Sequence, residues 1–182
     1  MRLTQILKVI CIVLLATFAL VGCIASSSQI PTSTPIPPLT LDLLKNAEYR
    51  YPGEERRVRL IDGFYQESNG IANTSLRLWE QPIAFADLNG DGVEDAIVIL
   101  DYNPGGAMGF PTLVIVLNQG GTLYDAAEAG LGDRTKIKNI RVDGKTITLD
   151  VVTHQPGDGL CCPTLDAIWQ FRFESNKLIP LQ

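Results

Sequence analysis

The sequence predicts a mainly β fold: a single antiparallel β-sheet domain, arranged as a meander or in a sandwich-like way, with one short N-terminal helix. Three observations support this prediction. After residue 51, apolar residues recur mostly with the period of two that is typical of strands. Val, Ile, Thr and aromatic residues concentrate in segments of strand length. Turn dipeptides such as Asp143-Gly144 separate these segments. An α+β fold is the alternative.

Each element follows from a local pattern. Helical spacing is found in residues 39–51, at Leu41, Leu43, Leu44 and Ala47. The strand-like segments that follow span residues 57–66, 76–86, 96–102, 112–119, 136–142, 146–154 and 167–174. Two of them, at 96–100 and 113–117, are apolar throughout, which predicts central strands covered on both faces. Asp143-Gly144 predicts a two-residue hairpin turn.

The N-terminus has the pattern of a secretory signal peptide. Arg2 and Lys8 form a basic head, and the apolar run that follows is shorter than the roughly 20 residues of a membrane-spanning helix. This run ends in LVGC, which resembles a bacterial lipobox whose cysteine, here Cys23, is acylated and becomes the new N-terminus. We therefore expect residues 1–22 to be a lipoprotein signal peptide. The alternative is an ordinary signal peptide with a chance cysteine.

The segment after the cysteine is rich in Ser, Thr and Pro and has too few apolar residues to offset its ordering entropy. We expect residues 23–38 to be the lipidated cysteine with a disordered tether, and residues 39–182 to be one globular domain. Loss of Arg2 and Lys8 leaves 13 of the 15 Lys and Arg against 20 Asp and Glu, a net charge of −7 instead of −5. This acidic balance argues against nucleic acid as a partner, so membrane contact should come from the lipid alone.

The segment DLNGDGVED, residues 87–95, concentrates four carboxylates between two strand-like runs. In calcium loops of the pattern D-x-[DN]-x-[DN]-G, the side chains at positions 1, 3 and 5 and the carbonyl at position 7 face the ion. The corresponding residues are Asp87, Asn89, Asp91 and Val93, with Asp95 as a further carboxylate. Oxygen-only ligands suit Ca²⁺ better than Mg²⁺. The sequence therefore predicts a structural Ca²⁺ that stabilises this connection.

The loop departs from an EF-hand, because Val98 stands where the bidentate Glu would be and strands flank the segment. It resembles instead the D-x-N-G-D-G-x-x-D loops of FG-GAP, VCBS and dockerin modules. The alternative is a turn without metal, since Asp, Asn and Gly favour turns in any case.

A second group of reactive residues lies in THQPGDGLCCPT, residues 153–164. It holds the sole histidine, His154, and the cysteines that a processed domain would retain, Cys161 and Cys162. Outside the cytoplasm thiols tend to oxidise, which predicts a vicinal disulfide; a rigid loop with two buried thiols is the alternative. A His/Cys/Cys zinc site fits less well, because adjacent cysteines lack the usual ligand spacing. With Asp158, these residues are also what a hydrolase or redox site would use.

The order of motifs behind the lipobox resembles one family. FADLNGDGVEDAIVIL, a glycine-rich loop, LGDR, VTHQPGD and CCPT follow one another as in LppP/LprE-like bacterial lipoproteins, over about residues 46–178. The resemblance implies an exported, membrane-anchored domain and supplies no catalytic residues. In LGDR, Asp133 and Arg134 are expected to form a local ion pair.

Together these features predict an extracytoplasmic lipoprotein, anchored to the cell membrane or outer membrane, whose calcium-stabilised β domain has a structural role or binds a protein or cell-surface component. The alternative is a hydrolase or redox protein that uses the loop from His154 to Cys162. The two hypotheses differ in geometry. An enzyme is favoured if the His154 and Asp87 loops share a pocket at one end of the sheet, and loses its site if they lie at opposite ends.

Overall fold

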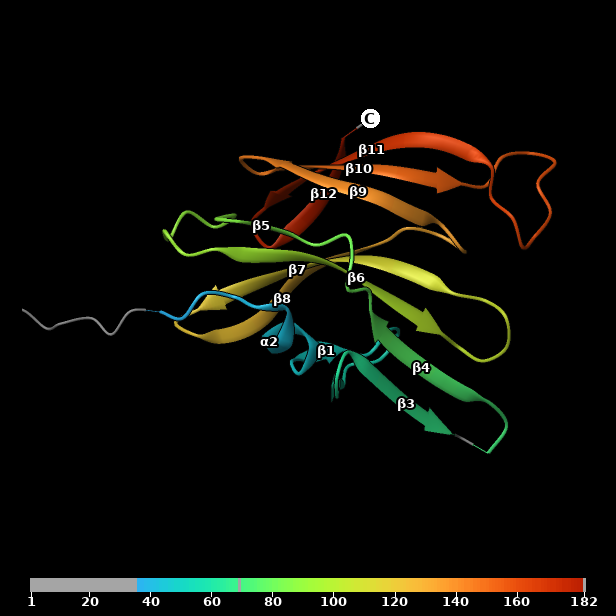
Figure 1. Cartoon of the computed structure of the whole chain (residues 1–182), viewed down its shortest axis with the longest axis horizontal. Helices are drawn as coiled ribbons and strands as arrows, with labels where there is room; N and C mark the ends of the chain where they lie inside the picture. Colours follow the sequence, from blue (N-terminus) through green and yellow to red (C-terminus); the bar gives the residue numbers. More distant parts are fainter. Residues whose placement is uncertain (1–35, 69, 182) are drawn as a thin grey trace, which may run out of the picture. The chain divides into compact units, whose positions relative to one another are not determined.

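The computed structural model describes residues 36–68 and 70–181. These residues belong to one unit of the chain, Pro35–Gln182. The predicted signal peptide, the lipidation site Cys23 and most of the predicted tether lie outside them. Within the described part, no helix is long and apolar enough to cross a membrane. The prediction of a mainly β fold with antiparallel sheets and a short helix is confirmed (Figure 1).

The strands of the described residues form three antiparallel sheets. The largest contains β3 (Phe64–Ser68), β4 (Asn73–Leu78), β6 (Asp95–Asn103), β7 (Phe110–Gln119) and β8 (Thr122–Gly130) in this order, and β5 (Ala84–Ala86) pairs with β6. A four-stranded sheet contains β12 (Lys177–Leu181), β11 (Leu165–Glu174), β10 (Thr146–Thr153) and β9 (Lys136–Asp143). The smallest pairs β1 (Glu48–Arg50) with β2 (Arg57–Arg59).

Strands β6 and β7 of the six-stranded sheet are covered on both faces, which confirms the prediction made from their apolar sequences. Along β6, Ile97 and Ile99 join a core formed with β9, β10 and β11, whereas Val98 and Leu100 join a core formed with α2 (Leu41–Lys45), β1 and β2. We call these the first core and the second core. Successive side chains of a strand point to opposite faces, so an uninterrupted apolar run supplies both cores.

The helix is shorter than the predicted segment. Thr40 caps it by accepting the backbone N–H of Leu43 at 3.2 Å. It ends at Lys45, and the chain then enters β1, whose Tyr49 is fully buried and donates to the Leu44 carbonyl at 2.9 Å. Pairing with β2 and burial of Tyr49 therefore override the helical spacing of residues 46–51.

Other element boundaries also differ from the prediction. The segment 57–66 is two strands, because Asp62 and Gly63 adopt positive φ values of 52° and 79° and reverse the chain between β2 and β3. The segment 76–86 divides into β4 and β5. Strands β8 and β12 were not predicted. The predicted hairpin between β9 and β10 is confirmed, with Asp143 paired to Thr146 and with Gly144 and Lys145 as its two turn residues.

Candidate functional site

The two predicted loop sites lie at opposite ends of the sheets. Strand β6 starts at Asp95, directly after the calcium-like loop, and it pairs antiparallel with β7 so that Ala96 faces Val116 and Tyr102 faces Phe110. The 154–164 loop lies at the far end, beside the β6–β7 connection, as the green and orange connections in Figure 1 show. The 87–95 and 154–164 loops therefore do not share a pocket. This argues against an enzyme whose active site uses residues of both loops.

Side chains in the 87–95 loop bind the loop's own backbone. Asp87 accepts the N–H groups of Gly90 at 2.7 Å and Gly92 at 2.9 Å, and these donors hold the pKa of its carboxyl below the usual range. Asn89 accepts from the N–H of Asp91 at 2.8 Å, and Asp91 in turn accepts from the N–H of Val93 at 2.8 Å. The loop thus consists of successive Asx turns.

Asp95 fixes the loop to the neighbouring hairpin. The residue is fully buried, and its two oxygens accept the backbone N–H groups of Leu88 and Asn118, each at 3.0 Å. Burial raises the pKa of this carboxyl despite the two donors. One carboxylate therefore holds together the β5–β6 loop and the end of β7.

The oxygen donors of this loop match Ca²⁺ in kind, since they are carboxylates, an amide and a carbonyl. Each carboxylate oxygen has two lone pairs, so acceptance of one N–H does not exhaust it. The described residues nevertheless contain no group of three or more His, Cys, Asp or Glu side chains placed to hold a metal ion. This applies equally to the zinc site considered for His154, Cys161 and Cys162.

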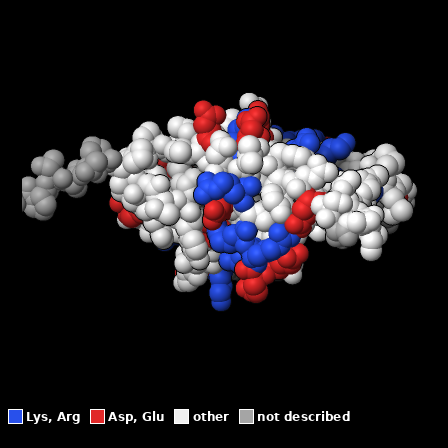
Figure 2. Space-filling view, turned by 90° about the horizontal axis from the view of Figure 1, so that it is seen from below, with Lys and Arg blue, Asp and Glu red and all other residues white. Residues whose placement is uncertain are grey.

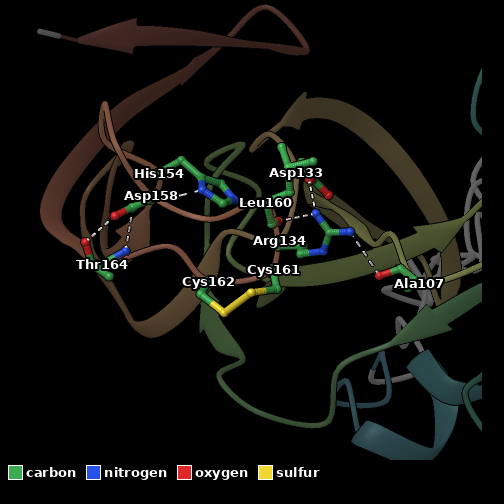
Figure 3. Close-up of a disulfide and its surroundings, with 9 residues drawn as sticks. All are labelled: Ala107, Asp133, Arg134, His154, Asp158, Leu160, Cys161, Cys162 and Thr164. Atoms are coloured by element: carbon green, nitrogen blue, oxygen red, sulfur yellow. Dashed lines mark hydrogen bonds and ion pairs between the residues drawn. A yellow bond between two sulfur atoms is a disulfide. The ribbon is translucent and has the colours of Figure 1, made fainter.

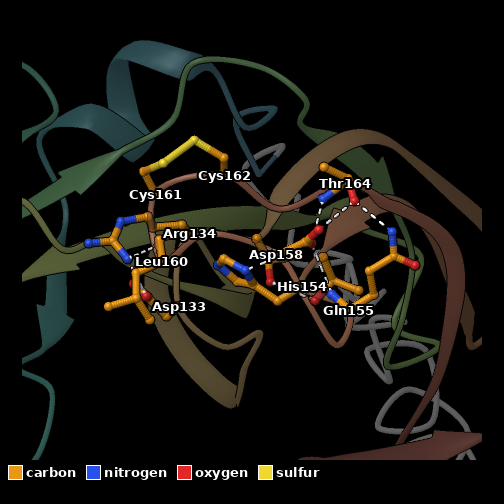
Figure 4. A network of polar contacts seen from close by, with 11 residues as sticks. Asp133, Arg134, His154, Gln155, Asp158, Leu160, Cys161, Cys162 and Thr164 are labelled. Carbon is orange, nitrogen blue, oxygen red and sulfur yellow. Dashed lines mark hydrogen bonds and ion pairs between the residues drawn. A yellow bond between two sulfur atoms is a disulfide. The ribbon is translucent and has the colours of Figure 1, made fainter.

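The 154–164 loop is closed by Asp158 (Figure 4). Its carboxylate accepts the N–H groups of Gln155 at 3.0 Å and Thr164 at 2.9 Å, and the Thr164 hydroxyl at 2.7 Å. These donors lower the pKa of the Asp158 carboxyl. The His154 Nδ1 atom lies 4.0 Å from the same carboxylate. Asp158 is therefore committed to holding the ends of its own loop together.

Cys161 and Cys162 form a disulfide, as one of the two predictions for this pair proposed (Figure 3). Both residues are exposed, so the alternative of two buried thiols is wrong. Leu160, directly before them, is 84% exposed, whereas Pro163, directly after them, is buried. The disulfide and Leu160 thus project from a loop that Pro163 anchors.

Arg134 connects three loops at this end of the domain. Its guanidinium donates to the Asp133 carboxylate at 2.5 Å, which confirms the predicted local ion pair. It also donates to the carbonyl of Leu160, and to the carbonyl of Ala107 at 3.3 Å (Figure 3). The LGDR segment indicated the ion pair of Arg134, but the sequence did not indicate its bonds to the carbonyls of Leu160 and Ala107.

On another face of the domain, the arginines of β2 and of the turn before it pair with nearby carboxylates. Arg57 pairs with the buried Asp125, and Arg59 pairs with Glu48 at 3.0 Å. Figure 2 shows blue and red side chains interleaved at the centre of the face seen from below. The positive charge of these arginines is therefore locally compensated, which favours a structural role.

No family model, curated protein or solved structure matches this chain. The resemblance to LppP/LprE-like lipoproteins therefore stays a prediction from the order of motifs in the sequence.

Proposed function

We propose that the chain is an exported lipoprotein, anchored to a cell membrane or outer membrane through acylated Cys23, whose β domain has a structural or binding role at the cell envelope. The basic head, short apolar run and LVGC sequence support export and lipidation. Two or more acyl chains anchor a protein stably, so the domain needs no membrane-binding surface of its own.

We further propose that Ca²⁺ stabilises this domain at the 87–95 loop. The ligands would be Asp87, Asn89, Asp91 and Asp95, with the carbonyl of Val93. The observation that carries this proposal is the buried Asp95, which links the loop to the β7–β8 hairpin while burial raises its pKa. A cation beside the loop would offset the cost of burying this charge.

Thermal unfolding of the full chain with Ca²⁺ and with chelator tests the ion. A ligand present at about 100 times its dissociation constant adds about 2.7 kcal/mol of stability, which raises the melting temperature of a domain of this size by roughly 5 to 11 °C. Asp91→Ala should abolish the response, because it removes a ligand oxygen. Asp143→Ala, which removes one exposed carboxylate at the end of β9, should retain it. No response in the parent protein would refute the calcium proposal.

The anchor has a separate test. Expressed with its N-terminus intact, the parent protein should partition into the detergent phase, and mass spectrometry of its N-terminal peptide should find acylated Cys23. Cys23→Ser should abolish the acylation and its processing. An unmodified Cys23 in the parent would refute lipidation and would leave the calcium proposal intact.

A further inference from the structure

An open cavity of about 580 Å³ lies on the six-stranded sheet, away from both loops discussed above. The lining comes from the β2–β3 turn, β3, β4, the end of β6 and the segment after β4. Among the described residues, the first core draws on β6, β7 and β8 of this sheet and on no residue of β3 or β4. On this face the four-stranded sheet therefore leaves β3 and β4 uncovered, and the volume is within the range of small-molecule sites.

Strand register places three lining side chains in one row. Phe64 of β3 faces Arg77 of β4, and Arg77 faces Asp101 of β6. The Arg77 guanidinium lies 5.2 Å from the centre of the Phe64 ring. Ser75 and Asn103 form the next cross-strand pair of the lining. Because facing residues on adjacent strands point to the same side of a sheet, the row forms part of the cavity floor.

Asp101 lacks a partner that its environment requires. Its Oδ1 atom is buried and has no hydrogen-bond partner among the described residues. The carboxylate packs against Gly109, where an added Cβ would lie 2.9 Å from this oxygen, so a residue larger than glycine would press on it. Burial raises the pKa of Asp101, although hydrogen bonding to Trp79 and the charge of Arg77 both oppose the shift. A buried acceptor that lacks a hydrogen-bond partner destabilises the fold.

The charges around the cavity indicate what kind of ligand would meet this need. Lys45 pairs with two of the acidic lining residues, Asp62 at 2.6 Å and Glu80 at 3.0 Å, and Arg77 faces the third, Asp101. Two cations stand against these three carboxylates, so a polyanion is repelled and a single negative charge is left for a cation. A neutral ligand rich in hydroxyl groups can donate to the carboxylates and accept from Lys45 and Arg77 without burying an uncompensated charge.

The remaining lining fits the same class of ligand. Ser75 and Gln81 offer both donors and acceptors, and Phe64 and Trp79 supply apolar surface against which the C–H groups of a sugar ring can pack. We propose that this cavity binds a neutral carbohydrate, with Asp101 accepting hydrogen bonds from its hydroxyl groups. The inference gives a ligand class to the binding role proposed above, but it requires neither the acyl chains nor Ca²⁺.

Calorimetric titration of the full chain tests this inference. The protein is purified in a detergent without a sugar headgroup and is titrated with maltotriose, cellotriose and chitotriose, and with tripolyphosphate as an anionic probe. We expect saturable binding of at least one trisaccharide and none of tripolyphosphate. Binding of no trisaccharide, or of tripolyphosphate alone, would overturn the inference.

Matched variants locate the binding. Asp101→Asn should weaken it about tenfold or more, because a charged acceptor is lost. Asp166→Asn, on the exposed side of β11 with its side chain 75% exposed, should leave it unchanged. Arg77→Gln replaces Asp101→Asn if the latter does not fold. Undiminished binding by the cavity variant would overturn the inference.

Repetition of the titration with chelator separates this inference from the calcium proposal. Sugar binding should persist without Ca²⁺, because no proposed Ca²⁺ ligand lines the cavity. Sugar binding without any thermal response to Ca²⁺ would refute the ion and retain the cavity. A thermal response to Ca²⁺ without sugar binding would support the ion and would refute the proposed cavity site.

Discussion

Replacement of Arg134 by Ala should loosen the end of the domain that carries the disulfide. The guanidinium bonds to the carboxylate of Asp133 and to the carbonyls of Leu160 and Ala107, and its side chain is 21% exposed. A hydrogen bond contributes about 0.5–1.5 kcal/mol net, and more when a charge takes part. Because Arg134 is partly exposed, water can replace some of these hydrogen bonds in the variant. We therefore expect the free energy of unfolding to fall by about 1.5–3 kcal/mol in total.

Urea denaturation of parent and variant measures this loss. Arg172→Ala, which removes an exposed arginine from β11, is the matched control and should change stability by less than about 0.5 kcal/mol. The rate at which a dithiol reduces the Cys161–Cys162 bond provides a local readout, because loss of the Leu160 contact should speed it. A variant with parent-like stability and an unchanged reduction rate would refute the role assigned to Arg134.

Three further predictions concern other parts of the domain. Leu149→Ala removes a fully buried side chain of the first core and should cost about 2–5 kcal/mol by urea denaturation; a smaller loss would show that the core collapses around the deletion. The pKa of Asp158 is lowered in the fold, so its stabilisation is present above its unfolded pKa and is lost as pH falls through the folded value. The stability difference between parent and Asp158→Asn should therefore shrink in acid, and a difference independent of pH would contradict this. Without reductant, Cys161 and Cys162 should resist alkylation, and peptide mapping that finds them alkylated would contradict the disulfide.

The central strands could be predicted because every residue along the segment is apolar. An apolar run such as 96–100 must be covered on both faces wherever it pairs, so its burial does not depend on knowing the partner. Strand β8 was missed for the opposite reason. Its sequence, TLYDAAEAG, contains three Ala together with Asp, Glu and Gly, all of which are poor strand formers, and pairing with β7 outweighs this preference.

The calcium-like loop and the Cys-Cys loop were recognisable because each is local. Their residues lie close in sequence, and Asx turns and a vicinal disulfide need no distant partner. The cavity has no such signature. Phe64, Arg77 and Asp101 become neighbours through two strand registers that the sequence does not specify, so no reading of motifs could have brought them together.

Comparison with two buried carboxylates elsewhere in the fold makes the half-buried Asp101 the most informative residue of the cavity. Both oxygens of Asp95 accept backbone N–H groups, and Asp125 accepts the guanidinium of Arg57 on one oxygen and the N–H of Arg50 on the other. The same fold leaves one oxygen of Asp101 without a described partner. Because burial raises its pKa, ionisation costs more in the folded chain than in the unfolded one, and this residue destabilises the domain as pH rises from its unfolded pKa. Asp101→Asn should therefore be at least as stable as the parent at neutral pH while it binds sugar less well, and a residue that opposes stability in this way is expected where a ligand completes the site.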